Sequence, residues 1–153
     1  MAIRELEKPR AQMCGHFANG CSIYQDRPAS CRGFRCAWLI NPGLDETWRP
    51  DRAGFFIWFD HPTRRMIVET DPDDPDAWKR DPFYARFKAW SDPRNYPAGM
   101  EPWGVVVRRV TDLTVVFPET EIELGPERGA GILSGYELKG GRPTPFARYV
   151  DEV

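Results

Sequence analysis

Two apolar runs in the middle of the chain predict a pair of neighbouring strands. Residues 53–60 (AGFFIWFD) and 64–70 (RRMIVET) are rich in aromatic and β-branched side chains, which favour extended backbone. Only the short polar segment HPT separates the two runs, so the chain turns back directly after the first one. We therefore expect an antiparallel hairpin in this region.

Later segments of similar apolar character predict further short strands at 103–110, 113–117, 121–124 and 131–138. Thr111 and Asp112 separate the first two of these segments, which predicts a second hairpin with a tight turn. The tail from residue 140 onward (GGRPTPFARYVDEV) mixes glycine, proline and charged residues. It is predicted to be irregular apart from a short final element.

One segment has helical periodicity. Within residues 77–90, the apolar side chains at positions 83, 84, 87 and 90 fall on one face of a helix. Pro82 suits the first turn of this helix better than its middle. The flanking segments 71–76 and 91–102 are polar and rich in proline, which predicts loops. Together these elements predict an α+β fold with a mostly antiparallel sheet and one or two helices.

Length and charge restrict the class of protein. The 153 residues suit a single domain (1–153), in which we expect a cysteine-cluster lobe (10–54) and an α+β remainder (55–153). The chain has 21 Lys and Arg against 23 Asp and Glu. It lacks the excess of basic residues that is typical of nucleic-acid-binding proteins, so we expect no nucleic-acid partner. No apolar run is long enough to span a membrane, and the charged N-terminus lacks the apolar centre of a secretory signal. We therefore expect a cytoplasmic protein without a membrane partner.

The cysteines are the strongest chemical signal in the chain. Cys14, Cys21, Cys31 and Cys36 follow the spacing C-x6-C-x9-C-x4-C, and the long remainder has no cysteine. In a reducing compartment, disulfides are the poorer explanation of such clustering. Thiolates gathered around a soft or borderline metal ion are the better one, although the spacing does not identify the metal. We predict that the four thiolates converge on one ion; the alternative is a set of inert, buried thiols.

The residues around the last two cysteines predict a short helix. Pro28 suits its first turn, and the segment RPASCRGFRCAWL (27–39) continues it. On a regular helix Cys31 and Cys36 would lie about 140° apart. Both reach one metal ion only if the helix distorts or ends between them, and Gly33 is a suitable place for this.

The pattern C-x-I-Y-x-x-R-P-x-x-C-R-x-F-x-C-x-W-L over residues 21–39 resembles the second half of the YkgJ-type cysteine-cluster family, described as zinc- or iron-chelating domains. The matching residues are Cys21, Ile23, Tyr24, Arg27, Pro28, Cys31, Arg32, Phe34, Cys36, Trp38 and Leu39. The segment RPDRAG (49–54) also resembles the stretch after the cluster in short members. Longer members begin with an additional C-x-x-C-x-x-x-C-C run, where this chain has only Cys14. The resemblance implies a chelating site and leaves its metal and purpose open.

Three functions are compatible with such a site. The first is structural zinc, because a closed four-thiolate site leaves no position for a substrate and stabilises a lobe with little core of its own. The second is a redox module in which the same cysteines hold iron or an iron–sulfur cluster. The third is an enzyme that uses His16 as an open-position ligand or base, and no complete catalytic set accompanies it. Otherwise His16 is a spare ligand, which replaces Cys14 only if that thiol is turned away.

Residues between the cysteines are predicted to support the lobe: Tyr24, Arg27, Arg32, Phe34 and Trp38. Phe34 and Trp38 are spaced i,i+4 on the predicted helix and should face the sheet together. Arg27 should donate hydrogen bonds to nearby carbonyls or a carboxylate and hold the turn before the helix. Arg27 and Arg32 would also offset the negative charge of the thiolates, unless they simply lie on a solvated helix face.

Overall fold

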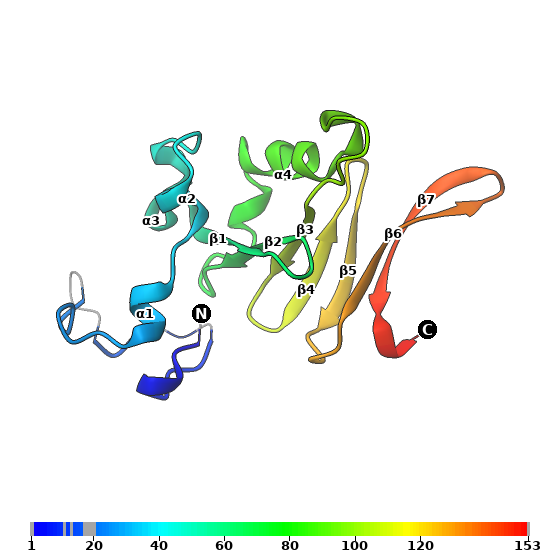
Figure 1. Cartoon of the computed structure of the whole chain (residues 1–153). Coiled ribbons are helices and arrows are strands. Elements are labelled where there is room, and N and C mark those ends of the chain that lie inside the picture. Colours follow the sequence, from blue (N-terminus) through cyan, green and yellow to red (C-terminus); the bar gives the residue numbers. More distant parts are fainter. Residues whose placement is uncertain (1, 11, 13, 17–20, 153) are drawn as a thin grey trace.

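The computed structural model describes residues 2–10, 12, 14–16 and 21–152, and Figure 1 shows their arrangement. Within these ranges a five-stranded sheet contains β1 (Phe55–Asp60), β2 (Arg65–Thr70), β3 (Gly104–Arg108), β4 (Asp112–Val116) and β5 (Glu121–Pro126) in sequential order. A hairpin of β6 (Ile132–Lys139) and β7 (Arg142–Tyr149) follows it. The α-helices are α1 (Ala29–Gly33), α2 (Ala37–Ile40), α3 (Pro50–Ala53) and α4 (Phe83–Ser91). Short 3-10 helices lie at Arg4–Leu6, Glu46–Trp48, Ala77–Lys79, Pro93–Asn95 and Val150–Glu152.

The predicted strands of the sheet are confirmed. β1 and β2 form the first antiparallel hairpin, β3 and β4 form the second, and β5 pairs with the far side of β4. β2 and β3 pair in parallel, because the chain between them crosses one face of the sheet through α4 before it returns. The fold is therefore α+β with a mostly antiparallel sheet, and it includes a β-α-β crossover. The described residues form four short α-helices, more than the one or two predicted.

Helices cover one face of this sheet. Phe87 of α4 and Trp78 of the preceding 3-10 helix are completely buried there. They belong to one continuous core with Phe55 of β1, Val68 of β2 and Val105 of β3. Aromatic rings bury large areas of apolar surface and meet edge to face, so this layer is the main hydrophobic core.

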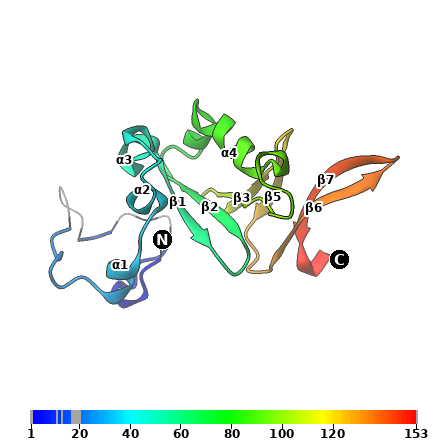
Figure 2. The ribbon, with the colours of Figure 1, turned by 45° about the horizontal axis from the view of Figure 1, so that its top comes forward.

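The base of the β6–β7 hairpin packs against the opposite face of the sheet. Tyr149, at the end of β7, is completely buried and packs with Ile67, Val106 and Val115. The Tyr149 hydroxyl donates a hydrogen bond to the carbonyl oxygen of Pro126 at 2.7 Å. In Figures 1 and 2 the rest of the hairpin extends away from the sheet, on the side opposite the N-terminal residues.

The prediction of an irregular C-terminal tail is wrong, because most of the tail forms β7. Gly140 and Gly141 have φ values of 57° and 76°, and they form the two-residue turn that such hairpins favour. β7 pairs with β6 alone in the described part of the chain. Within these residues the other edge of β7 pairs with no strand and needs no backbone N–H donors, so Pro143 and Pro145 are tolerated in this strand. The Gly-Gly pair was the sequence signal for this hairpin.

The helix predicted over 77–90 is shorter than expected. A 3-10 helix ends at Lys79, and α4 begins at Phe83 directly after Pro82. Proline has no amide hydrogen to donate, so it precedes the helix and does not continue an earlier one. Within the described residues, no helix is both long and apolar enough to cross a membrane.

The N-terminal segment, defined here as residues 2–35, differs from the rest of the chain in burial. Ile3 is the only buried residue among those that the structure describes in this segment, and α1 buries none of its side chains. From Ala37 onward the chain belongs to the main core, to which it contributes Leu44, Trp48 and Ala53. We call residues 37–152 the sheet body.

Candidate metal centre and the adjoining cavity

The cysteines lie before, within and after the first α-helix. Cys14 and Cys21 precede α1, Cys31 lies within it, and Cys36 directly precedes α2. Cys36 is buried, Cys14 and Cys31 are half-buried, Cys21 is exposed, and all four are free thiols. The single helix predicted over 27–39 is instead two, because α1 ends at Gly33, the place that the sequence offers for a break, and Phe34 after it is extended.

Cys31 has two other thiols in its neighbourhood. Partial burial raises the pKa of the Cys31 thiol, and Cys14, Cys21 and the Glu5 carboxylate raise it further, whereas the Arg27 guanidinium opposes them. This environment disfavours the thiolate form of Cys31, so a metal ion that binds there has to displace the proton of the thiol.

Polar contacts hold the chain around Cys31 in place. The Glu5 carboxylate accepts hydrogen bonds from the backbone N–H of Ser30 at 3.2 Å and from its hydroxyl at 2.7 Å. This contact connects the first 3-10 helix to α1. Arg32 donates hydrogen bonds to the carbonyl oxygens of Arg27 at 2.8 Å and Gln25 at 2.9 Å. Arg32 therefore braces the loop that leads into α1.

Arg27 and Tyr24 form the predicted support before Pro28. Arg27 donates a hydrogen bond from Nη1 to the Tyr24 carbonyl oxygen at 2.8 Å, which confirms the expected bond to a nearby carbonyl. Its guanidinium carbon also lies 3.7 Å from the centre of the Tyr24 ring, a cation–π contact. The two residues hold the turn in which the chain reverses before α1.

Phe34 and Trp38 both reach the sheet body, but they do not share a helix. The Phe34 ring, in the link after α1, meets the Phe56 ring of β1 edge to face with 5.3 Å between the ring centres. Trp38 lies in α2 and is half-buried against the main core. The predicted i,i+4 arrangement is wrong, because the chain is extended between α1 and α2.

The donors of the cysteine cluster suit zinc or iron, since thiolates bind both metals in closed sites. In the part of the chain that the structure describes, no three side chains of His, Cys, Asp or Glu lie together as a group able to hold a metal ion. The His16 residue is exposed, and its carbonyl oxygen accepts hydrogen bonds from the backbone and hydroxyl of Ser22. Convergence of the four cysteines on one ion therefore stays a prediction.

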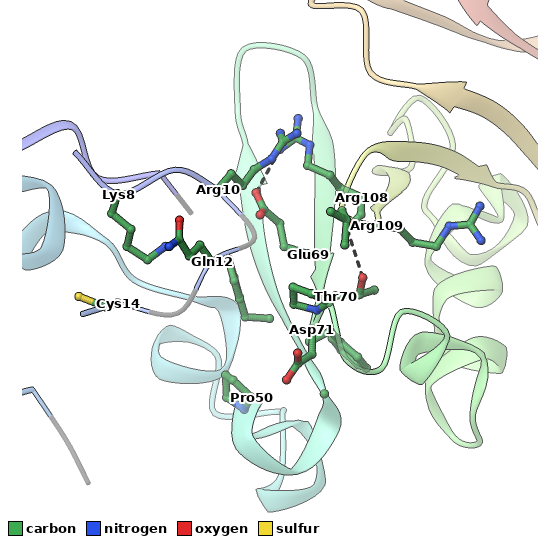
Figure 3. Close-up of a pocket in the computed structure, with 15 residues that line it drawn as sticks. Lys8, Arg10, Gln12, Cys14, Pro50, Glu69, Thr70, Asp71, Arg108 and Arg109 are labelled. Atoms are coloured by element: carbon green, nitrogen blue, oxygen red, sulfur yellow. Dashed lines mark hydrogen bonds and ion pairs between the residues drawn. The ribbon is translucent and has the colours of Figure 1, made fainter. Parts of the chain in front are cut away.

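A cavity of about 420 Å³ lies between the N-terminal segment and the sheet (Figure 3). Lys8, Gln12 and Cys14 line it from the N-terminal segment. Residues 69–71 and 108–110 line it from the ends of β2 and β3. The carboxyl ends of parallel strands joined by a helical crossover are common places for ligand sites. A thiol of the cysteine cluster thus borders a cavity at such a position.

Charged side chains form a network on the sheet side of this cavity. Arg108 donates hydrogen bonds to Glu69 at 3.1 Å and to Glu127 at 3.0 Å. Glu69, which is buried, also accepts a hydrogen bond from the indole N–H of Trp58 at 3.3 Å. Arg10 forms an ion pair with the other oxygen of Glu127. This network links the N-terminal segment to the sheet body.

The two arginines of this network hold the Glu127 carboxylate in the charged form. Burial raises the pKa of the Glu127 carboxyl, but Arg10 and Arg108 together hold that pKa below its usual range. We did not identify these residues from the sequence. In the sequence, Glu69 and Arg108 stand out as charged residues directly after the apolar runs MIV and VVV. This pattern marks the two residues but does not show which distant residues they contact.

Comparisons with known proteins found no relative of this chain. No protein-family model matches the chain, and no curated protein or solved structure matches it either. The resemblance to the YkgJ-type cysteine-cluster family stays a prediction based on residues 21–39. The candidate centre therefore depends on the four cysteines and their surroundings.

Proposed function

We propose that this chain is a small metal-binding protein in which Cys14, Cys21, Cys31 and Cys36 hold one structural zinc ion. The observation that supports this best is the burial of the N-terminal segment, where Ile3 alone is buried among the described residues. Three of the cysteines lie in this segment and the fourth directly follows it. The cysteines are therefore located where the described residues bury little apolar surface.

The physical argument concerns the size of a stable core. A segment of this length buries too little apolar surface to offset the conformational entropy that it loses on ordering. Its polar contacts, such as Glu5 with Ser30, are exposed and contribute little each. A metal ion bound by four thiolates contributes its binding free energy to the folding of the segment around it. This contribution is the role that we assign to zinc.

One cation near Cys31 suits a thiolate site. Four thiolates around a divalent ion leave a net negative charge, which a nearby cation offsets. The Arg27 guanidinium acts in this sense on Cys31, whereas burial, two other thiols and the Glu5 carboxylate together raise the pKa of the Cys31 thiol. The proposal requires reduced cysteines, and therefore a reducing compartment such as the cytoplasm.

Iron, alone or as an iron–sulfur cluster, is the alternative occupant of the same thiolates. The half-exposed Cys31 with Arg27 beside it supports this alternative, because positive charge and solvent near a cluster tune its reduction potential. The protein would then serve as a redox module. A catalytic role for the metal, with His16 as a further ligand or base, is the weakest of the proposals.

Elemental analysis and an absorption spectrum of anaerobically purified protein test this function together. We expect about one zinc ion per chain and no visible absorption, because zinc has a filled d shell. Visible charge-transfer bands with bound iron would select the redox alternative. Protein that contains neither metal, and takes up neither when reduced, would contradict the proposal.

Single substitutions test which residues bind the ion. Cys36→Ser should abolish stoichiometric metal binding, although Cys36 is remote from solvent, because removal of a thiolate opens the site. His16→Ala is the matched control and should retain the full metal content. An equal loss in both variants would replace the four-thiolate site by one of three thiolates and an imidazole.

A further inference from the structure

A second cavity, of about 400 Å³, lies at the amino ends of the parallel strands β2 and β3. The turn after β1, the loop before β3 and part of β6 line it. This position is at the opposite end of the two strands from the cavity beside Cys14, and the two cavities have no lining residue in common. The second cavity is therefore separate from the cysteine cluster.

Two consecutive arginines line this second cavity. The half-buried Arg65 donates a hydrogen bond from Nη2 to the carbonyl oxygen of Ile132. Arg64 donates one from Nη2 to the carbonyl oxygen of Glu101 at 2.8 Å. Among the described residues, neither guanidinium forms an ion pair with a carboxylate. A carbonyl oxygen is a neutral acceptor, so these bonds orient the guanidinium groups without neutralising their charge.

Two acidic residues lie near these arginines. Asp60 is opposite Arg65 in the β1–β2 hairpin, and its carboxylate accepts a 2.5 Å hydrogen bond from the Thr63 hydroxyl. Glu101 is exposed at the rim of the cavity. Burial lowers the pKa of Arg65, and the charge of Asp60 only partly opposes this. Arg65 is thus a desolvated cation with incomplete charge compensation.

Aromatic side chains and a hydroxyl complete the cavity. Phe117 and Tyr136 meet edge to face with 5.6 Å between their ring centres, which fixes both rings. Trp103 lines the cavity near Arg64, whose guanidinium carbon is 5.5 Å from the centre of the indole ring. Ser134 supplies a hydroxyl that forms no hydrogen bond within the described part of the chain. The cavity therefore combines flat apolar walls with guanidinium and hydroxyl donors.

We propose that this cavity binds a small aryl carboxylate or aryl phosphate, whose anionic oxygens accept hydrogen bonds from Arg65 and whose ring packs against Trp103 and Phe117. The oxyanion supplies the counter-charge that Arg65 lacks, and a guanidinium donates to two oxygens of such a group at once. The aromatic walls favour a ligand with a flat apolar part over an inorganic ion. This binding is independent of the metal centre.

A titration of the whole chain, followed by backbone amide chemical shifts, tests the proposal. The probes are benzoate, phenyl phosphate, inorganic phosphate and the uncharged benzamide. We expect saturable shifts at Arg65, Gly104 and Gly135 with an aryl anion, and binding at least ~10-fold weaker for benzamide and inorganic phosphate. The stronger of the two aryl anions identifies a carboxylate or a phosphate ester as the ligand type. Absence of saturable shifts with both aryl anions, or equal binding of benzamide, would overturn the proposal.

Matched substitutions separate a specific site from general attraction to positive charge. Arg65→Gln removes the charge but keeps an N–H group for the Ile132 carbonyl, and it should weaken the preferred aryl anion at least ~10-fold. Arg142→Gln removes the same charge from the exposed start of β7 and should change the affinity less than about twofold. Equal losses in both variants would contradict the site.

A third substitution covers the case in which Arg65→Gln does not fold. Trp103→Leu leaves both arginines in place and removes one aromatic wall. It should weaken the aryl anion several-fold while inorganic phosphate binding stays unchanged. Unchanged aryl-anion affinity in this variant would exclude the cavity as the binding site.

Discussion

In the sheet body, apolar side chains lie on both faces of the sheet, and separate covers bury them: helices on one face and the base of the β6–β7 hairpin on the other. In the N-terminal segment, Ile3 is the only buried residue among those described. There, hydrogen bonds such as those of Arg32 to backbone carbonyls hold the chain. The body therefore folds by burying apolar surface, whereas the N-terminal segment depends on polar contacts and, in our proposal, on a metal ion.

This difference separates the causes of stability in the two regions. Loss of a core side chain should unfold the body, while loss of the metal ion or of a polar contact should release the N-terminal segment alone. Contacts that join the regions include the Phe34–Phe56 ring pair and the ion pair of Arg10 with Glu127. Substitutions in each region test how independent the two are.

The largest effect is expected from Phe87→Ala in the main core. Phe87 is 0% exposed, and emptying such a site costs about 3–5 kcal/mol in the free energy of unfolding. Urea unfolding followed by circular dichroism measures it. Leu138→Ala is the control, because Leu138 is 76% exposed and its loss should change stability by less than about 0.5 kcal/mol. Similar values for both variants would contradict the assigned core.

Glu127→Gln should have the next largest effect, because it breaks contacts to both Arg10 and Arg108. We expect a loss of about 1–3 kcal/mol at neutral pH, since the partners are only partly solvated. The control is Glu46→Gln, whose pairs with Arg49 and Arg52 are exposed and contribute little. Denaturant unfolding of both variants measures the difference, and equal losses would contradict the role of the network.

The same carboxylate predicts a pH dependence. The pKa of Glu127 is lower in the folded chain than in the unfolded one, so its contribution is complete above the unfolded value of about 4.3 and is lost as the pH falls through its folded pKa. Wild-type stability should therefore decline more steeply in acid than that of Glu127→Gln. Parallel declines in unfolding curves between about pH 6 and pH 3 would count against this assignment.

Trp38→Ala tests the coupling between the regions. Trp38 is half-buried against the main core, so the cost should be about 2 kcal/mol, less than for a completely buried ring. Because Trp38 follows Cys36 closely, the variant should also lose its metal faster to a chelator. Leu39→Ala, with a side chain that is 64% exposed, is the control for both measurements. A destabilised variant that retains metal as the wild type does would show that the regions are independent.

The smallest effect is expected from Glu5→Gln. The Ser30 hydroxyl and N–H hold the pKa of Glu5 below its usual range, so the contact is complete at neutral pH and weakens only in acid. The substitution should speed amide hydrogen exchange in α1 and leave the urea midpoint of the body unchanged. Glu7→Gln, nearby and exposed, is the matched control. A shift of the global midpoint would show that this contact stabilises more than its own segment.

Local sequence determined much of the sheet. The runs FFIWF and MIVET in β1 and β2, and VVV in β3, are extended because β-branched and aromatic side chains favour that backbone. The break after Gly33 and the start of α4 after Pro82 also follow from single residues, since glycine and proline restrict where helices continue. The cysteine spacing likewise places the candidate metal ligands in one stretch of the sequence.

Only the tertiary structure decided which distant groups meet. Glu69 and Arg108 are charged ends of apolar strands in the sequence, and their contact arises because β2 and β3 pair in parallel after the α4 crossover. Arg10 reaches Glu127 across most of the chain, and Arg65 of β2 donates to the neutral Ile132 carbonyl oxygen at the start of β6, which is distant in the sequence. Backbone preference acts over a few neighbouring residues, whereas the compensation of a buried charge depends on every segment that packs around it. For this reason the strands could be predicted from the sequence, and the partners of the buried charges could not.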